Sequence, residues 1–452
     1  MSAVFSGCAR QPEEPSLDFD PPESFSEAGA VEPQDRWWTG FDDKQLNSLV
    51  EKALEENFDL RTAWHRLREA RALAERRSAS LFPEIDAFSE AEARRSPGVR
   101  GDEEVFSLGM SADYEVDLWG RISSEVDAER YRADAGLEAY RTAAVSLSAE
   151  VAQTWYQLTE ACSRLELLRD QAGANKKILS LVRARFANGR TGRADVFRQE
   201  QLFESTREQV HAAQSQISVL QHRLAVLLGR SPGRKTGCGS SNLPDPPPLP
   251  ETGVPTELLS RRPDVREARL RLNAADMDLA AARISRYPRL SITASASTSD
   301  ENTAELFQDW FRSIAANLAA PVLDGGRLRA EADAAEAVKN QRLYEYGQTV
   351  VEAFQEVEDA LVQEEKQKDR VESLEKQLDL AKSAVRQLQS QYFNGEGSYI
   401  DVLNALTEQQ QLQRDLLAGK QELIEYRIAL YRALAGGFDT GRTAGDSRQV
   451  QH

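Results

Sequence analysis

The chain has 452 residues, with 56 Lys and Arg against 73 Asp and Glu, so its formal net charge is −17. This acidic balance argues against a nucleic-acid partner and favours solubility or an electronegative cavity. No apolar run reaches the ~18 residues of a transmembrane helix. The three cysteines, Cys8, Cys162 and Cys238, have no metal-ligand spacing and define no disulfide framework.

The N-terminal segment, residues 1–35, predicts a lipoprotein-like start followed by a flexible tether. The sequence VFSGC, which ends at Cys8, matches the small-residue pattern before a lipidated cysteine, so Cys8 is the candidate site for palmitate. The stretch that follows is rich in Pro, Glu, Ser and Asp, as unstructured linkers are. Only seven residues precede Cys8, too few for a signal peptide, so the chain either starts late or carries no signal. The alternative is an incidental cysteine in a disordered tail.

Proline positions divide the rest of the chain. None of the 17 prolines lies between Pro97 and Pro232, and none follows Pro321. Because proline breaks helix interiors, those two stretches can form long helices, whereas LPDPPPLP (243–250) is a linker. The linker separates two halves.

The two halves are copies of each other. Matching positions keep one offset, as in 395 − 189 = 206; examples are Tyr140 and Tyr346, Asn188 and Asn394, Gly189 and Gly395, and Asp195 and Asp401. Chance does not place so many pairs in one register, so the chain contains an internal duplication. We predict a first repeat over 36–230, a linker over 231–255, a second repeat over 256–438 and a polar tail over 439–452.

Each copy predicts a helix, two strands, a long helix, a turn and a second helix. The first helices are expected over 59–81 and 264–286, and each is followed by a proline. The hydrophobic period then changes to two, as in VFSLGMSADYEVD (105–117) and LSITASAST (290–298). IAANLAAPV (314–322) also places its apolar residues on one side, and a weaker strand is expected from Ile85. Four such segments suit membrane strands with lipid on one face and water on the other; the alternative is a soluble sandwich.

Four strands cannot close a membrane barrel, which needs about eight or more. Open sheet edges are not tolerated in lipid, so several chains must share one barrel.

The long helices are expected over 121–187 and 326–391, each ~100 Å long at 1.5 Å per residue. Their return helices, 192–229 and 397–435, are ~57 Å long, and the missing length matches the first helices. We infer that two short helices, stacked end to end, accompany each long one. Residues such as Val371, Leu374 and Leu378 indicate a coiled-coil seam. A cytosolic coiled-coil scaffold is the alternative.

No pattern predicts an enzyme or a cofactor. His211 and His222 lie ~16 Å apart along a helix, too far to share a metal. No phosphate loop, nucleophile elbow or metal-ligand motif is present.

Five motifs resemble the TolC-like outer-membrane efflux proteins of the lipoprotein branch. They follow one another within residues 34–438: YEVDLWGRI (114–122), LLSRRPDVREA (258–268), APVLDGGRLRAE (320–331), AFQEVEDAL (353–361) and YRALAGGF (431–438). The resemblance implies a mainly α-helical fold and a homotrimer whose twelve-stranded outer-membrane barrel stands on a long periplasmic α-helical barrel. The linker would contribute to an equatorial belt.

The resemblance implies that the chain is the lipid-anchored exit duct of a tripartite efflux pump and passes small molecules outward. Its partners would be outer-membrane lipid, a periplasmic adaptor protein and an inner-membrane transporter of the resistance-nodulation-division type. The alternatives are a coiled-coil adaptor without a barrel and, within the family, a type I secretion duct.

The resemblance also assigns roles to the two helix turns. They would be periplasmic tips where an adaptor docks, formed by Asn188, Gly189, Arg190, Thr191, Asn394, Gly395, Glu396, Gly397 and Ser398. In the family, a tyrosine before the second tip bonds an aspartate after the first, which gives Tyr392 and Asp195 here. Asp401 takes the position of an aspartate ring that narrows the entrance.

This chain departs from the family pattern at two gate positions. Asn404 stands where a second ring is expected, and Gly397 stands where some members have a gate arginine. A plainer role for Asp195 and Asp401 is stabilisation of helix N-termini, worth ~0.3–1 kcal/mol each.

Overall fold

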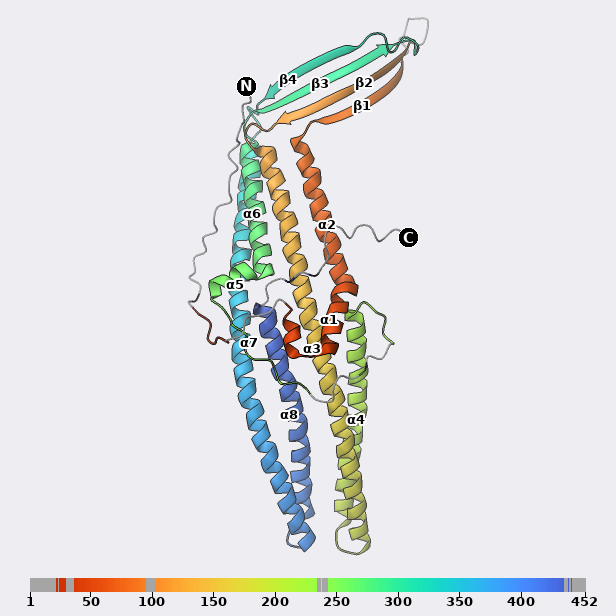
Figure 1. Cartoon of the computed structure of the whole chain (residues 1–452), viewed down its shortest axis with the longest axis vertical. Helices are drawn as coiled ribbons and strands as arrows, with labels where there is room; N and C mark the ends of the chain where they lie inside the picture. Colours follow the sequence, from red (N-terminus) through yellow and green to blue (C-terminus); the bar gives the residue numbers. More distant parts are fainter. Residues whose placement is uncertain are drawn as a thin grey trace. The chain divides into compact units, whose positions relative to one another are not determined.

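The computed structural model describes residues 22, 24–29, 36–94, 103–233, 237, 243–434, 438 and 440. Cys8 and most of the predicted tether and tail lie outside them. The described residues form a mainly helical chain with one small sheet (Figure 1), which confirms the coarse fold class. Within the described part, no helix is both long and apolar enough to cross a membrane.

The chain divides into two compact units, and each unit draws on both sequence copies. Among the described residues, the first unit covers Trp64–Ala139 and Asp264–Thr349, and the second covers the remainder. The structural units therefore cut across the duplication, because strands and helices of one copy pack with those of the other.

The first unit contains an antiparallel sheet in the order β1-β2-β3-β4 (Figure 1). Its strands are β1 (Glu84–Arg94), β2 (Glu103–Val116), β3 (Arg289–Asp300) and β4 (Phe311–Ala319). The pairing of β2 with β3 joins the two copies. The fourth strand was expected over 314–322 but begins earlier and ends two residues before Pro321, which cannot donate to a ladder.

The pairing register gives the sheet one apolar and one polar face. One row of paired residues across the four strands is apolar: Ile85, Ala112, Ala294 and Ile314. The next row is polar: Asp86, Ser111, Ser295 and Ser313. On the polar face, the Ser295 and Ser313 hydroxyls are hydrogen-bonded at 2.8 Å. The period-two pattern in the sequence therefore produces a two-faced sheet.

An aspartate caps the start of each long helix. Asp117 accepts from the backbone N–H groups of Ile122 at 2.9 Å and Ser123 at 2.8 Å, at the start of α3 (Arg121–Ala187). Asp324 accepts from Leu328 at 2.9 Å and from Gly326 at 3.0 Å, at the start of α7 (Arg327–Asn394). The bond from Leu328, then that from Gly326, lowers the pKa of Asp324. Helix N-termini favour such anionic acceptors.

The return helices, α4 (Arg193–Leu227) and α8 (Tyr399–Leu434), lie within a few residues of their expected bounds. So do α2 (Phe58–Ser78) and α6 (Pro263–Ile284). Asn57 Nδ2, just before α2, donates to the Leu227 carbonyl of α4 at 2.9 Å. Arg262, just before α6, donates to the Ala433 carbonyl of α8 at 3.1 Å. Both copies therefore have the inferred end-to-end junction, made by different side chains.

The core of the second unit contains an aromatic cluster that the sequence patterns did not predict. The fully buried Trp37 and Trp38 belong to a 3-10 helix, Trp37–Phe41, and Trp37 stacks on Tyr431 with ring centroids 5.6 Å apart. Asp43 caps α1 (Lys44–Glu56) and accepts a 2.7 Å bond from the Trp155 indole. The N-terminal helices are thus fixed against α3 and α8.

Two further features of the second unit differ from expectation or extend it. Cys162, on α3, is disulfide-bonded, although the three cysteines define no disulfide framework in the sequence. The spacing of three cysteines carries no information on which residues the fold brings together.

The linker is held by Arg427 of α8, which pairs with Glu364 and donates to the Pro247 carbonyl.

Candidate functional site

The two helix turns of the second unit are built in the same way. Gly189 has φ +71° and Gly395 has φ +85°, in the left-handed region that favours glycine. At the first turn, the Arg190 N–H donates to the Arg185 carbonyl at 2.9 Å; at the second, Glu396 donates to Gln391 at 2.9 Å. This pattern of bonds ends helices in a left-handed cap, and it explains why Asn-Gly recurs at both places.

Both turns lie at the same end of the second unit, where α3 meets α4 and α7 meets α8 (Figure 1). The predicted tip residues are exposed except Thr191 and Gly397, which are half-buried. Exposed Phe186, Phe197 and Phe393 lie beside them, and the sequence patterns gave no sign of this aromatic surface.

The predicted bond between Tyr392 and Asp195 is not direct. The Tyr392 hydroxyl donates to Thr191 Oγ1 at 3.4 Å, and the Thr191 hydroxyl donates to Asp195 Oδ2 at 2.7 Å. Asp195 also pairs with Arg198 at 3.3 Å. The direct bond expected from the resemblance is therefore corrected to a relay through Thr191. Its first step is weak, because 3.4 Å is long for an O–H···O bond.

A cation contributed by α3 faces the same tyrosine. The Arg185 guanidinium carbon lies 4.6 Å from the centre of the Tyr392 ring and 5.8 Å from that of Phe393. Cation–π contacts of this kind contribute ~0.5–2 kcal/mol. Gly397 has little room for a side chain, since an added Cβ would lie 3.3 Å from Gln391 Cβ and from the Tyr392 nitrogen. An arginine does contact Tyr392, but it is Arg185 of α3 and not a residue at position 397.

A small apolar cluster supports these contacts. It contains Val182, Tyr392, Tyr399 and Val402 from α3, α7 and α8. The buried Tyr399 hydroxyl donates to Gln199 Oε1 at 2.5 Å. Burial raises the pKa of Tyr399 above its ordinary value, and nearby Tyr392 and Asp195 raise it further. The phenol therefore stays protonated and remains a donor.

Asp401 and Asn404 lie on the exposed side of α8, while Val402 belongs to the apolar cluster. Asp401 is in the first turn of α8, so its position also suits the plainer helix-end role. The two side chains are one turn apart, and both are exposed.

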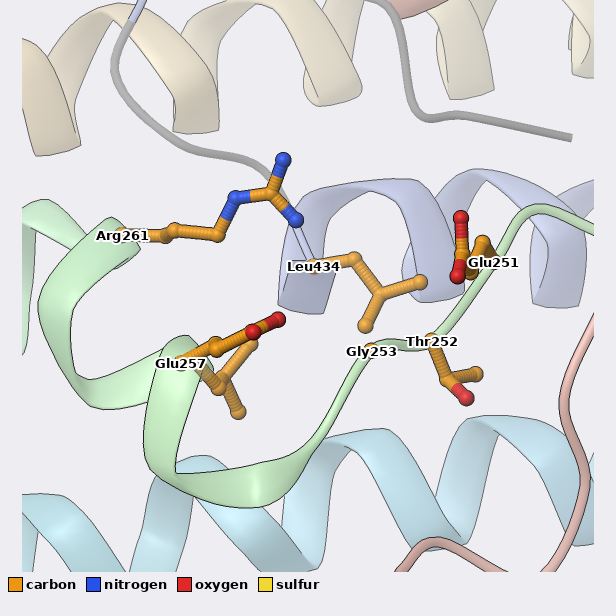
Figure 2. Close-up of a pocket in the computed structure, with 7 residues that line it drawn as sticks. Glu251, Thr252, Gly253, Glu257, Arg261 and Leu434 are labelled. Atoms are coloured by element: carbon orange, nitrogen blue, oxygen red, sulfur yellow. The ribbon is translucent and has the colours of Figure 1, made fainter.

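The rest of the described part of the chain can be compared with the arrangements that catalysis or metal binding requires. Within the described residues, no group of three or more His, Cys, Asp or Glu could hold a metal ion. Figure 2 shows a shallow hollow beside α5 (Pro255–Arg261), lined by Glu257, Arg261 and Leu434 among others, with no room for a bound molecule. Its polar side chains form no nucleophile and base arrangement.

Comparisons with known proteins agree with this geometry. Residues 49–230 and 254–436 match the family described as outer membrane efflux protein. The chain is 30% identical over 427 residues to the pyoverdine export outer membrane protein OpmQ of Pseudomonas aeruginosa, covering 90% of this chain and 88% of OpmQ. It is 28% identical over 463 residues to the cation efflux system protein CusC of Escherichia coli, covering 97% of each.

A solved structure is also similar. The open state of the Neisseria gonorrhoeae MtrE outer membrane channel has a TM-score of 0.85 at 26% identity, covering 95% of this chain and 98% of MtrE. These relatives confirm the predicted outer-membrane location and the predicted role as an efflux channel. The chain belongs to the outer membrane efflux protein family.

Proposed function

We propose that three copies of the chain assemble into the exit duct of a tripartite efflux pump, with their three sheets closing one twelve-stranded barrel. The observation that carries this proposal is the four-stranded sheet with one apolar and one polar face. An apolar face suits lipid, and a polar face suits a water-filled lumen.

The sheet edges support a shared barrel. Among the described residues, β1 and β4 each have a strand partner on one side only. Unpaired backbone groups cost several kcal/mol each in lipid, so these edges need partners inside a bilayer. Pairing β4 of one subunit with β1 of the next closes a ring of 3 × 4 = 12 strands, an even number within the range of known barrels.

The proposed protein partners would bind at the end of the duct that carries the two exposed helix turns. A periplasmic adaptor would bind the exposed turns at Asn188–Thr191 and at 394–398, and would connect the duct to a resistance-nodulation-division type transporter. The duct itself performs no chemistry and needs no cofactor. OpmQ and CusC are named for pyoverdine export and cation efflux, so ducts of similar sequence serve different substrates. We infer that the transporter selects the substrate.

Assembly tests the proposal directly. The protein is expected in the outer-membrane fraction as a trimer that resists sodium dodecyl sulfate when unheated and dissociates on boiling to a 50.4 kDa chain. Closed barrels keep their backbone bonds away from detergent, which explains the expected resistance. A soluble monomer at every temperature would refute both the barrel and the trimer, and would favour the coiled-coil alternative.

Lipidation of Cys8 is a separate proposal with its own test. Expressed behind a lipoprotein signal peptide that ends just before Cys8, the protein is expected to incorporate a labelled fatty acid. Cys8→Ser should abolish the label, while the chain that keeps Cys8 should carry it. Channel formation should survive Cys8→Ser, because a single acyl chain gives only marginal membrane binding. Full labelling of Cys8→Ser would exclude this site.

A further inference from the structure

A chain of buried amides crosses the second unit between α3, α4 and α8. We call Gln171, Asn175, Gln199 and Gln410 the amide ladder; all four side chains are at most 4% exposed. Buried amides are uncommon in helical seams unless their donors and acceptors are paired.

The ladder is paired by directional bonds. Gln410 Nε2 donates to Asn175 Oδ1 at 2.9 Å, and Asn175 Nδ2 donates back to Gln410 Oε1 at 3.2 Å. Gln171 donates to the Gln410 carbonyl at 3.1 Å. Gln199 donates to the Asn175 carbonyl at 3.1 Å and accepts from the Tyr399 hydroxyl at 2.5 Å. The ladder therefore reaches from the seam of α3 and α8 to the first residue of α8.

The duplicated seam lacks this ladder. Adding the offset of 206 to Asn175, Gln199 and Thr206, which bonds Asn175 at 2.9 Å, gives Ala381, Ala405 and Leu412. There, Leu412 packs with Leu374 and Leu378, and Ala381 packs against them. At the positions that match the ladder, the α7–α8 pair is thus held by apolar packing, while α8 is held to α3 and α4 by amides. One buried amide elsewhere in the α7–α8 pair, Gln367, donates to the Gly419 carbonyl at 2.8 Å.

This difference matters because the two kinds of seam resist different movements. Apolar side chains tolerate a small slide of one helix along another, since dispersion contacts are not directional. Paired buried amides do not, because a slide leaves donors and acceptors without water or partners. A single polar residue in a helical seam can specify register for this reason.

We propose that the amide ladder sets the register of α8 against α3 and α4 and thereby positions the gate residues Tyr392 and Asp401 in the closed state. Gln410 and Asn175 act as positioning residues, through Tyr399 and the apolar cluster at the turns. This proposal rests on the proposed function, because it concerns the gate of an efflux duct.

The test replaces Gln410 by Met, which keeps the volume and removes the amide. Single channels in planar bilayers are expected to show several conductance levels above the wild-type value instead of one. Cells are expected to become more susceptible to large hydrophilic antibiotics. The matched control is Gln377→Leu on the exposed side of α7, where the amide donates to the Ser373 hydroxyl at 3.3 Å, away from the ladder; it should behave as wild type.

A second variant separates positioning from stability. Asn175→Leu with Gln410→Met removes both members of the central pair, so no amide of that pair is left unsatisfied. We expect this trimer to melt no lower than the single variant and still to show the additional conductance levels. One level at the wild-type conductance in the double variant would refute the register role. If the wild-type protein itself formed no channels, the proposed function would fail instead.

Discussion

Arg185→Gln is expected to raise single-channel conductance in planar bilayers more than Tyr392→Phe does. Phe keeps the ring that faces the guanidinium at 4.6 Å and loses only the long hydroxyl contact of 3.4 Å with Thr191. The cation–π contact is worth ~0.5–2 kcal/mol, whereas a hydrogen bond of that length contributes less than the usual ~1 kcal/mol. We therefore expect the Arg185 contact to contribute more than the Tyr392 hydroxyl to the proposed closed state.

The size of the effect follows from the proposed trimer. Three contacts of about 1 kcal/mol bias the closed state by about 3 kcal/mol, or roughly a hundredfold in population. Tyr392→Ala removes both contacts and should open the channel furthest. Arg183→Gln is the matched control, because Arg183 pairs with Glu200 at 2.8 Å and has no contact with Tyr392 among the described interactions. Wild-type conductance in Arg185→Gln would show that this arginine does not hold the gate.

Asp401→Ala is expected to weaken cation selectivity and block by multivalent cations. In the proposed trimer, three exposed carboxylates at the start of α8 would converge on the duct axis, and a ring of carboxylates favours cations. Reversal potentials in a salt gradient and titration with a trivalent cation measure the two effects. Asn404→Asp, one turn later on the same exposed side, should strengthen the block by adding a second ring.

The matched control for Asp401 is its counterpart in the first copy. Asp195 also lies in the first turn of its helix, but it is half-buried and paired with Arg198. Asp195→Asn should therefore leave selectivity unchanged while costing a similar helix-end stabilisation, ~0.3–1 kcal/mol. If Asp401→Ala and the wild type had equal cation selectivity, Asp401 would only stabilise the N-terminus of α8.

The regular elements were predictable because their signals are local. Proline-free stretches and the change of period gave both long helices and all four strands, and α3 has the expected bounds of 121–187. The aromatic cluster around Trp37 was not predictable in this way. Its members come from segments separated by hundreds of residues, and only the folded chain brings Trp37 to Tyr431.

The positions of the two helix turns were predictable from the sequence, but the side-chain contacts around them were not. The offset of the duplication located both turns, because positive-φ glycines leave a clear Asn-Gly signature. The contacts of Thr191 and Arg185 with Tyr392 were not predicted. A resemblance assigns roles to single positions, and it does not say which other side chains contact those residues. The amide ladder, in contrast, could have been detected in the sequence. When the two copies are aligned, Asn175 corresponds to Ala381 and Gln199 corresponds to Ala405.

The two turns share a backbone but carry opposite charge. Arg190 in the first turn corresponds to Glu396 in the second, since 396 − 190 = 206, and both side chains are exposed. In a trimer, the rim would therefore alternate between basic and acidic turns, three of each kind. A ring of identical adaptor subunits on such a rim would meet two chemically different binding sites. Each subunit would have to bind the basic and the acidic turns through different patches of its surface, or the adaptor would bind only one of the two kinds of turn.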